Sequence, residues 1–262
     1  MKILLIGDSC IDEYIYGTCD RLSPEQPVPV LKYTRTTTSP GMAANVKLNL
    51  EAFGANVTFV TNWEPILKER LVDERTGNHI VRIDTEGPVT PLDVTKFLDA
   101  DLNDLYDCIV ISDYNKGFVT TGAIQWIRKM FNGPIFVDTK KQDLFAFEGC
   151  FVKINELEYA AAKTLCTDLI VTRGKHGATY HDYVCPAPQV NVHDVCGAGD
   201  TFLAALAYRY QMRRRVNSKD NRNKYWHTDI IAAIEFANKA SAITVQHNGV
   251  YVPTDEDIKT LW

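Results

Sequence analysis

Two glycines and an alanine precede an aspartate in the stretch DVCGAGDTF, residues 194–202. The run that follows, LAALAYRYQM, is apolar at helical spacing, so residues 197–200 are predicted to form the first turn of a helix. The free N–H groups of such a turn favour an anion, and glycines let that anion approach the backbone closely. Asp200 is therefore either an N-cap or a general base beside a phosphate-binding hole, and this motif alone leaves both open.

The elements that must position this motif alternate along the chain. Short apolar runs rich in β-branched residues, such as KILLIG and CIVISD, alternate with runs of helical spacing, such as TTGAIQWIRKMF. This alternation predicts βαβ units around a buried parallel sheet, with ligands at the carboxyl ends of its strands. Polar residues, namely Asp113, Asp138 and Asn155, follow three of the predicted strands. A site where they converge is our hypothesis.

Two stretches do not fit the alternation. Residues 27–41, PVPVLKYTRTTTSPG, are predicted to be a polar, Thr-rich strand pair, and HIVRIDTE is predicted to be another strand. We expect a small β-lid over residues of about 14–40 and 78–86, with a decorated edge of the main sheet as the alternative. No interdomain linker is evident, so residues 1–262 are predicted to form one domain.

Composition excludes several classes of protein. The 262 residues are 45% hydrophobic and 23% charged, with a net charge of -5, which favours small-molecule chemistry over nucleic-acid binding. Seven cysteines lie without metal-ligand spacing, which predicts a reduced, cytoplasmic chain. The apolar run in MKILLIGDSC is short and indicates a first strand rather than a signal peptide. No segment is long enough to span a membrane, so no membrane partner is expected.

The Gly-rich motif resembles the signature of the ribokinase/PfkB sugar kinases. The resemblance implies that Asp200 takes the proton of a sugar hydroxyl, and that backbone amides of Gly197, Ala198 and Gly199 form the anion hole. The motifs RLSPEQPVPV, ISDYNKG and VTRGKHG occur in the order seen in the kinase domain of bacterial ADP-heptose synthases.

This resemblance, which runs from Met1 to about Val250, implies a fold and a reaction. The fold is a ribokinase-like three-layer α/β/α sandwich with a mostly parallel sheet. The reaction uses ATP and Mg²⁺ to phosphorylate a small-molecule sugar phosphate, D-glycero-D-manno-heptose 7-phosphate, to the 1,7-bisphosphate.

Further site residues are implied by the same resemblance. Sugar contacts are implied at Asp12, Gly41 and Asn45. Nucleotide contacts are implied at Thr172, Gly174, Gly177 and Asn238. Asn155 and Glu158 match an N-x-x-E motif near magnesium and phosphate, and their spacing at a helix start places them on one face. Lys116 and Lys140 follow strand ends and are candidates for contacting the substrate phosphate or ATP. Taken alone, Glu158 is an exposed helix carboxylate, VTRGKHG a plain β-turn and each lysine a solvated side chain.

The chain also departs from the family pattern. Met42 stands where a second glycine is usual, and Cys196 stands where a threonine is usual. Only WEPIL joins VTFVTN to KERLV, so a helix and a strand at the sheet edge are expected to be missing. No HxGH sequence occurs, so we expect no nucleotidyltransferase half in these residues.

These departures keep two alternatives open. One is a kinase of the same fold that acts on another sugar, and the other is a non-catalytic sugar-phosphate or nucleotide binding protein. A homodimer through the lid is expected in either case, because exposed strands such as VPVLKYT invite pairing.

Overall fold

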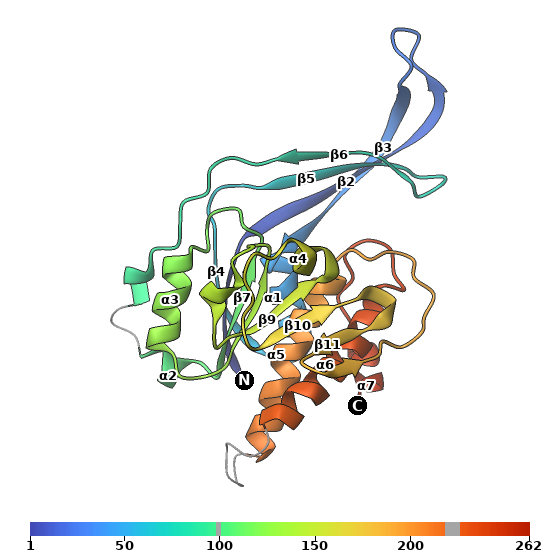
Figure 1. Cartoon of the computed structure of the whole chain (residues 1–262). Coiled ribbons are helices and arrows are strands. Elements are labelled where there is room, and N and C mark those ends of the chain that lie inside the picture. Colours follow the sequence, from blue (N-terminus) through green and yellow to red (C-terminus); the bar gives the residue numbers. More distant parts are fainter. Residues whose placement is uncertain (98–100, 218–225) are drawn as a thin grey trace.

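The computed structural model describes residues 1–97, 101–217 and 226–262 of the chain. Its larger sheet has the strand order β12-β11-β10-β9-β8-β7-β1-β4 (Figure 1). The strands are β1 (Lys2–Gly7), β4 (Asn56–Thr61), β7 (Cys108–Asp113), β8 (Ile135–Thr139), β9 (Phe151–Asn155), β10 (Leu169–Thr172), β11 (Ala178–Tyr180) and β12 (Tyr183–Cys185). All neighbours are parallel except the pairs that involve β11 and β12, so the prediction of a mostly parallel sheet is confirmed.

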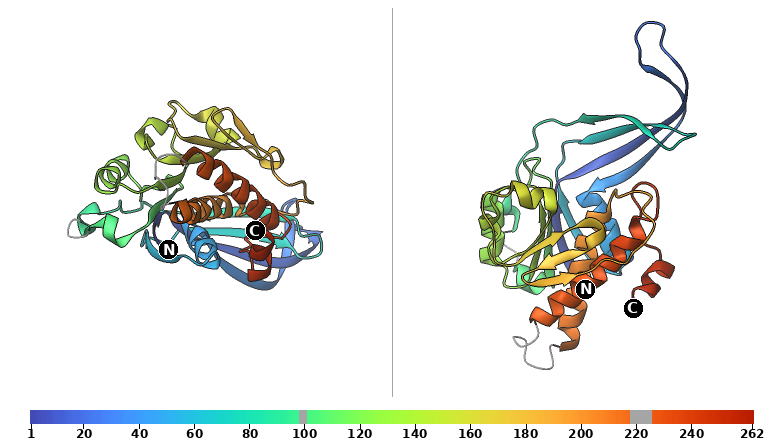
Figure 2. Two further views of the ribbon diagram at one scale, coloured as in Figure 1. Left: turned by 90° about the horizontal axis from the view of Figure 1, so that it is seen from below. Right: turned by 45° about the vertical axis from the view of Figure 1, so that its right-hand side comes forward.

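Helices cover both faces of this sheet (Figures 1 and 2). The longer helices are α1 (Ala43–Ala52), α3 (Thr121–Met130), α5 (Ala198–Asn217) and α6 (Trp226–Thr244). The shorter ones are α2 (Leu102–Leu105), α4 (Glu156–Ala161), α7 (Asp255–Thr260) and the 3₁₀ turns η1 (Val94–Phe97), η2 (Leu144–Phe147) and η3 (Gly174–His176). None of the helices within the described ranges has the length and apolarity needed to cross a bilayer.

The alternation of side chains along β1 shows how the sheet forms the middle layer. Ile3 and Leu5 belong to a core that includes residues of α1, α5 and α6. Leu4 and Ile6 point to the other face and belong to a second core that includes residues of α3. All four are almost completely buried. Burial on both faces explains the uninterrupted apolar run KILLI, which is typical of a central parallel strand.

A second sheet of four strands rises above the main body and forms the lid (Figures 1 and 2). Its order is β3-β2-β5-β6, with β2 (Ser9–Leu22), β3 (Pro29–Met42), β5 (Leu67–Asp73) and β6 (His79–Thr85). The predicted bounds were too narrow, because β2 begins at Ser9 and β5 is also part of the lid. The Thr-rich run was wrongly predicted to be a strand pair. It is one long strand, β3, because its partner is β2.

The connection between the two sheets is short on the β4 side. Residues 62–66 join β4 to β5 and hold no helix or strand, as predicted from WEPIL. The side chain of Asn62 fixes this turn, because its Oδ1 accepts the Ser9 N–H at 2.7 Å and its Nδ2 donates to the Glu64 carbonyl at 2.7 Å. As a result β4 is the outer strand of the main sheet, and the chain passes from it directly into the lid.

Candidate active site

Asp200 lies in the first turn of α5, and its carboxylate is buried. Asn45 Nδ2 donates to Asp200 Oδ2 at 2.9 Å, and the Tyr114 hydroxyl donates to Asp200 Oδ1 at 2.8 Å. Burial raises the pKa of Asp200 to about 6, because a carboxylate removed from water loses hydration, whereas both hydrogen bonds act to lower it. A carboxyl group with this pKa is largely ionised at neutral pH and can still accept a proton, as a general base must.

The turn before Asp200 presents backbone N–H groups. Gly197 has φ of 77°, a left-handed conformation that glycine adopts at little cost. The N–H groups of Gly197 and Gly199 make no hydrogen bond within the described ranges, whereas that of Ala198 donates to the Val195 carbonyl at 3.3 Å. Two of the three amides predicted to bind an anion are therefore free to do so.

A cavity of about 210 Å³ opens beside this turn. Its lining includes Thr172, Gly174, Gly177, Ala198, Gly199 and Asn238. The fold therefore brings all four predicted nucleotide-side residues to one cavity that reaches the predicted anion hole. Gly177 also has a packing role, because a Cβ there would lie 2.0 Å from the Cys185 carbonyl oxygen. Asn238 Nδ2 donates to that same carbonyl at 2.8 Å, so both residues fix this wall of the cavity.

The lid supplies the side of the site that was predicted to bind sugar. Asp12 on β2 is buried and forms an ion pair with Arg70 on β5, with 2.5 Å between Oδ1 and Nη1. Gly41 on β3 makes room for this carboxylate, because a Cβ at Gly41 would lie 2.0 Å from Asp12 Oδ2. The predicted sugar residues Asp12 and Gly41 thus lie together, and Asn45 joins them to Asp200 through the start of α1.

Met42 occupies a backbone position suited to glycine. It precedes α1 with φ of 58° and ψ of -130°, outside the regions that non-glycine residues favour. Such a conformation costs about 1–3 kcal/mol. The side chain offsets part of this cost by burial against Cys10 and Ile66 under the lid. Met42, which stands where the family usually has glycine, therefore places a large side chain and a strained backbone conformation directly beside Gly41.

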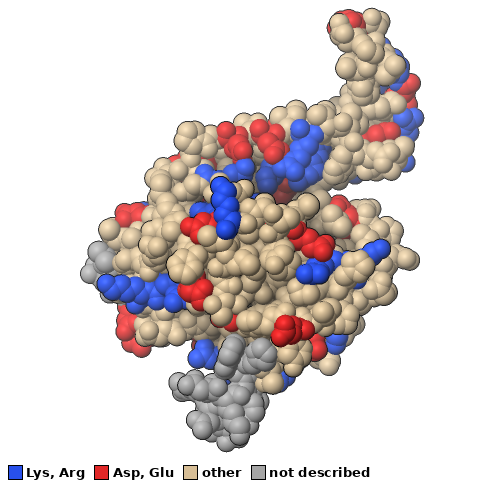
Figure 3. Space-filling view, in the orientation of Figure 1, with Lys and Arg blue, Asp and Glu red and all other residues tan. Residues whose placement is uncertain are grey.

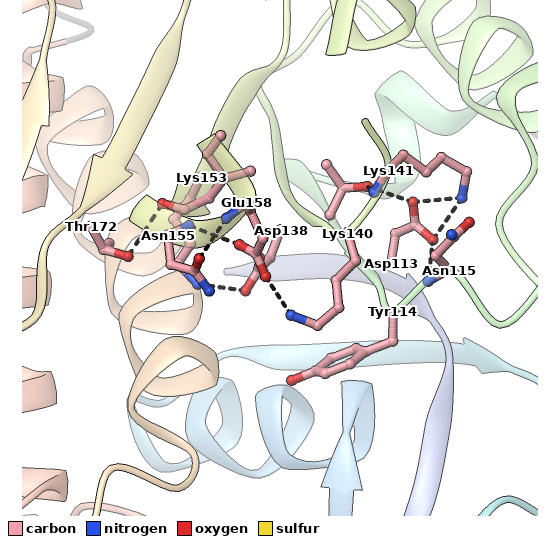
Figure 4. A network of polar contacts seen from close by, with 12 residues as sticks. Asp113, Tyr114, Asn115, Asp138, Lys140, Lys141, Lys153, Asn155, Glu158 and Thr172 are labelled. Atoms are coloured by element: carbon pink, nitrogen blue, oxygen red, sulfur yellow. Dashed lines mark hydrogen bonds and ion pairs between the residues drawn. The ribbon is translucent and has the colours of Figure 1, made fainter. Parts of the chain in front are cut away.

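Charged side chains at the ends of β8 and β9 form a network (Figure 4). Lys153 is buried, pairs with Asp138 at 2.7 Å, and lies so close to the anion hole that a Cβ on Gly199 would be 3.0 Å from its Nζ. Lys140 Nζ lies 2.5 Å from Glu158 Oε1. This ion pair raises the pKa of Lys140, although burial acts in the opposite direction.

Asn155 and Glu158 also form a capping box at the start of α4. Asn155 Oδ1 accepts the Glu158 N–H at 2.9 Å, and Glu158 Oε2 accepts the Asn155 N–H at 2.8 Å. The predicted metal residues therefore share one face and have a structural role. Lys116 lies elsewhere, with its Nζ 2.5 Å from Glu86 Oε2 just beyond β6, so it ties the loop after β7 to the lid. Basic and acidic side chains gather where the lid meets the body (Figure 3).

The carboxyl half of the chain has a family match. Residues 137–257 match the model described as pfkB family carbohydrate kinase. The chain contains a pfkB family domain. The matched range includes the nucleotide-side cavity, the capping box and the turn that carries Asp200.

Similar proteins match over almost the whole chain. Bifunctional protein HldE of Rhodopseudomonas palustris strain TIE-1 is 29% identical over 319 positions, which cover 98% of this chain and 62% of that protein. Bifunctional protein HldE of a Nitratiruptor species is 30% identical, and the alignment covers 98% of this chain and 64% of that protein. This chain therefore spans a little under two thirds of these relatives. The aligned length exceeds the 262 residues available, so the relatives hold segments that this chain lacks.

Solved structures show the same fold. A ribokinase from Thermotoga maritima superimposes with a TM-score of 0.68 at 17% identity, covering 99% of this chain and 98% of that one. Phosphofructokinase-2 from Escherichia coli in complex with potassium gives a TM-score of 0.69 at 17% identity, with 99% and 97% covered. The pfkB domain and its lid thus have a ribokinase-like α/β fold, as predicted.

Three residues of this candidate site were not predicted from the sequence. Tyr114 lies within ISDYNKG, and its place at a predicted strand end was a signal that could have pointed to it. The buried Lys153 lies in an apolar strand, where a lone lysine is unusual and was also a usable signal. Arg70 gave no such signal, because its contact with Asp12 depends on how β2 and β5 are aligned.

Proposed function

We propose that this chain transfers the γ-phosphoryl group of ATP to the anomeric hydroxyl of a sugar phosphate. The observation that carries the proposal is the position of Asp200. A buried carboxylate with a pKa raised to about 6 lies at the junction of the nucleotide-side cavity, the free amides of Gly197 and Gly199, and the sugar-side cluster. A protein that only bound its ligands would have no need for a base at this point.

The proposed reaction follows from this arrangement. Asp200 accepts the proton of the sugar hydroxyl as that oxygen forms a bond to the γ-phosphorus, and the bond from this phosphorus to the bridging oxygen breaks to leave ADP. Gly197 and Gly199 donate their N–H groups to the transferring oxygens, with the Lys153 ammonium nearby. The lid keeps water from Asp200, since water would otherwise compete with the sugar for the phosphoryl group.

The described residues of this site offer one candidate carboxylate for magnesium, Glu158, rather than a full set of protein ligands. The part of the chain that the structure describes holds no group of three or more His, Cys, Asp or Glu side chains suited to a metal. Mg²⁺ in kinases is commonly held by one or two carboxylates together with substrate phosphates and water, and it neutralises phosphate charge. Glu158, backed by Asn155, is the carboxylate that we assign to this role; it lies outside the lining of the cavity, and its oxygens are paired with Lys140 Nζ and the Asn155 N–H.

Glu158→Gln is expected to raise the Mg²⁺ concentration needed for half-maximal rate by about threefold to tenfold, because a neutral amide is a weaker ligand than a carboxylate. Glutamine keeps the capping box, so α4 is preserved. The measurement is a magnesium titration of the ATP-dependent rate. Glu156→Gln on the same helix, where Glu156 is exposed, is the matched control. An unchanged titration for Glu158→Gln contradicts the assignment of Asn155 and Glu158.

The acceptor that we propose is D-glycero-D-manno-heptose 7-phosphate. Its support is the set of motifs that resemble the heptose kinase domain and the similarity to Bifunctional protein HldE over 98% of the chain. The deciding experiment measures ATP consumption with no sugar, with this heptose phosphate and with a panel of other sugars and sugar phosphates. A clear preference for another sugar would replace this acceptor, and Met42 beside Gly41 favours that alternative. No sugar-dependent ATP consumption would leave only a binding protein.

We also propose that two copies pair through the lid. Ile11, Val81 and Ile83 on the lid strands are each close to half exposed, and the sheet they belong to projects from the body (Figure 2). Light scattering at micromolar concentration should give about twice the 29.5 kDa mass of one chain. Ile83→Lys should halve that mass, because a charge in a buried interface is costly. Val184→Lys on β12 is the control and should change nothing, and a monomeric wild-type protein would overturn the proposal.

A further inference from the structure

Tyr14 carries a buried hydroxyl with no hydrogen-bond partner. Its side chain lies on β2 and is only 7% exposed, yet its Oη contacts no donor or acceptor within the described ranges. Buried polar groups in folded proteins are almost always paired, and leaving one unpaired costs about 1–3 kcal/mol. The tyrosine ring alone does not account for this hydroxyl, since phenylalanine would fill the same space without the cost.

The surroundings of Tyr14 place this hydroxyl where the lid meets the body. Tyr14 lies two residues after Asp12 on the same strand, so both side chains point to the same face of the lid. The ring lies under the Arg70 guanidinium at 5.1 Å. On the body side, the Tyr14 Oη lies 3.8 Å from where a Cβ on Gly249 would be, and Gly249 N–H is held by Asp194 at 2.9 Å. The hydroxyl therefore faces Gly249, whose backbone is held by Asp194 at the start of the Asp200 motif.

The polar groups around this hydroxyl are suited to a polyol or its phosphate. Asp12 accepts hydrogen bonds, the Tyr14 hydroxyl can donate or accept, and Arg70 is a cation whose only hydrogen bond in the described part of the chain is to Asp12. Carboxylate, guanidinium and phenol together can satisfy sugar hydroxyls or phosphate oxygens. An apolar ligand would leave these groups unpaired, and a cationic ligand would be repelled by the Arg70 guanidinium, so both are disfavoured here.

We propose that Tyr14, with Arg70, forms a subsite of the lid that binds an oxygen of the acceptor other than the one that is phosphorylated. The proposal rests on the proposed kinase function, because it assigns Tyr14 to the acceptor and not to ATP. It makes Tyr14 a specificity-determining residue: an acceptor that presents an oxygen to this hydroxyl is bound more tightly than one that lacks it. The oxygen belongs either to a sugar hydroxyl or to a phosphate group of the acceptor.

The test is Tyr14→Phe in the full chain, with Tyr16→Phe as the matched control. Tyr16 follows on the same face of β2, with Arg35 at 3.8 Å over its ring, and its hydroxyl is not a buried orphan. We expect Tyr14→Phe to raise the KM for D-glycero-D-manno-heptose 7-phosphate by about fivefold to tenfold, with kcat and the KM for ATP unchanged, since one hydrogen bond to the acceptor is lost. The control should leave all three constants unchanged.

Thermal unfolding supplies a readout that does not depend on turnover. Removal of an unpaired buried hydroxyl should leave the Tm of Tyr14→Phe equal to or above that of the wild-type protein. A lower Tm with an unchanged acceptor KM would show that the hydroxyl stabilises the fold, and it would overturn the proposal. Calorimetric titration with the same heptose phosphate separates this result from failure of the kinase function: weaker binding by Tyr14→Phe supports the subsite even without turnover.

The source of the oxygen is decided by comparing acceptors. If the phosphate binds Tyr14, the loss caused by Tyr14→Phe should disappear with the unphosphorylated heptose as probe. If a sugar hydroxyl binds there, the loss should be the same with both probes. Wild-type protein that binds neither probe in calorimetry would overturn the proposal.

Discussion

Asp200→Asn is expected to lower turnover by about 10²–10⁴-fold while the protein still folds and binds ATP. A positioned general base contributes a factor of this size. The structure explains why folding should survive: asparagine has the same shape, and the Tyr114 hydroxyl can turn to accept from the new amide while Asn45 still donates to its oxygen. Single-turnover and steady-state rates with the preferred sugar measure the effect, and retained ATP affinity shows that the cavity is intact.

The pKa of Asp200 adds two expectations that depend on pH. Below about pH 6 the wild-type kcat/KM should fall about tenfold per unit, because the base becomes protonated. The contribution of Asp200 to the free energy of unfolding should become more favourable as the pH falls, while activity decreases. The folded pKa is raised above the unfolded value of 3.8, so the ionised carboxylate costs up to about 3 kcal/mol above pH 6, and this cost disappears as the pH falls towards 4.

Asp200→Asn should therefore unfold at higher denaturant concentration than the wild-type protein at pH 8, and the difference should shrink by pH 4. An N-cap role predicts the opposite pattern: activity is kept, and stability changes by no more than about 1 kcal/mol. A variant that phosphorylates its sugar at a near wild-type rate would remove the main support for the kinase proposal. Asp255→Asn, at an exposed acid in the first turn of α7, is a control for replacing an acid at a helix start.

The main sheet could be predicted because its signals are local. Alternating apolar runs and helical spacing identified the strands and helices around β1. The uninterrupted apolar run KILLI itself indicates that β1 is buried on both faces. The lid was predicted less well, since β5 has charged residues at several positions and reads as neither a buried strand nor a helix. Its place in the lid comes from its parallel pairing with β2, which is a contact between distant parts of the chain.

The residues of the candidate site also differ in whether local sequence signals could predict them. Residues within motifs, such as Gly177 and Asn155, could be proposed from the sequence because a motif carries its own local geometry. The partners of Asp200 and Asp12 were missed, because Tyr114 and Arg70 reach them across the fold. The register between β2 and β5 places Arg70 opposite Tyr14 and lets its guanidinium reach back to Asp12. A shift of one residue would turn Arg70 to the outer face of the lid, and no single segment of sequence fixes that register.

Asp12→Asn is the second change with a large expected effect, and it should act on both stability and the acceptor. Arg70 is buried, and its hydrogen bond within the described residues is to Asp12, so the variant leaves a guanidinium without its counter-charge. Breaking a buried ion pair on one side costs about 3–5 kcal/mol. The loss of a charged acceptor for sugar hydroxyls should lower kcat/KM for the acceptor by about 10²-fold or more, whereas the KM for ATP should stay within about twofold.

Asp20→Asn is the matched control for this pair, because it breaks an aspartate–arginine contact at the far end of the same strand. The Asp20 carboxylate lies 2.7 Å from Arg75, but both side chains are more than half exposed, so the change should cost less than about 1 kcal/mol and leave the kinetics unchanged. Equal destabilisation by both variants would mean that the lid opens Asp12 to water. In that case Asp12 would be too solvated to select the acceptor, and the sugar site would have to lie elsewhere. A large loss of stability and of kcat/KM for Asp12→Asn alone supports a closed lid in which the buried Asp12 carboxylate binds the acceptor.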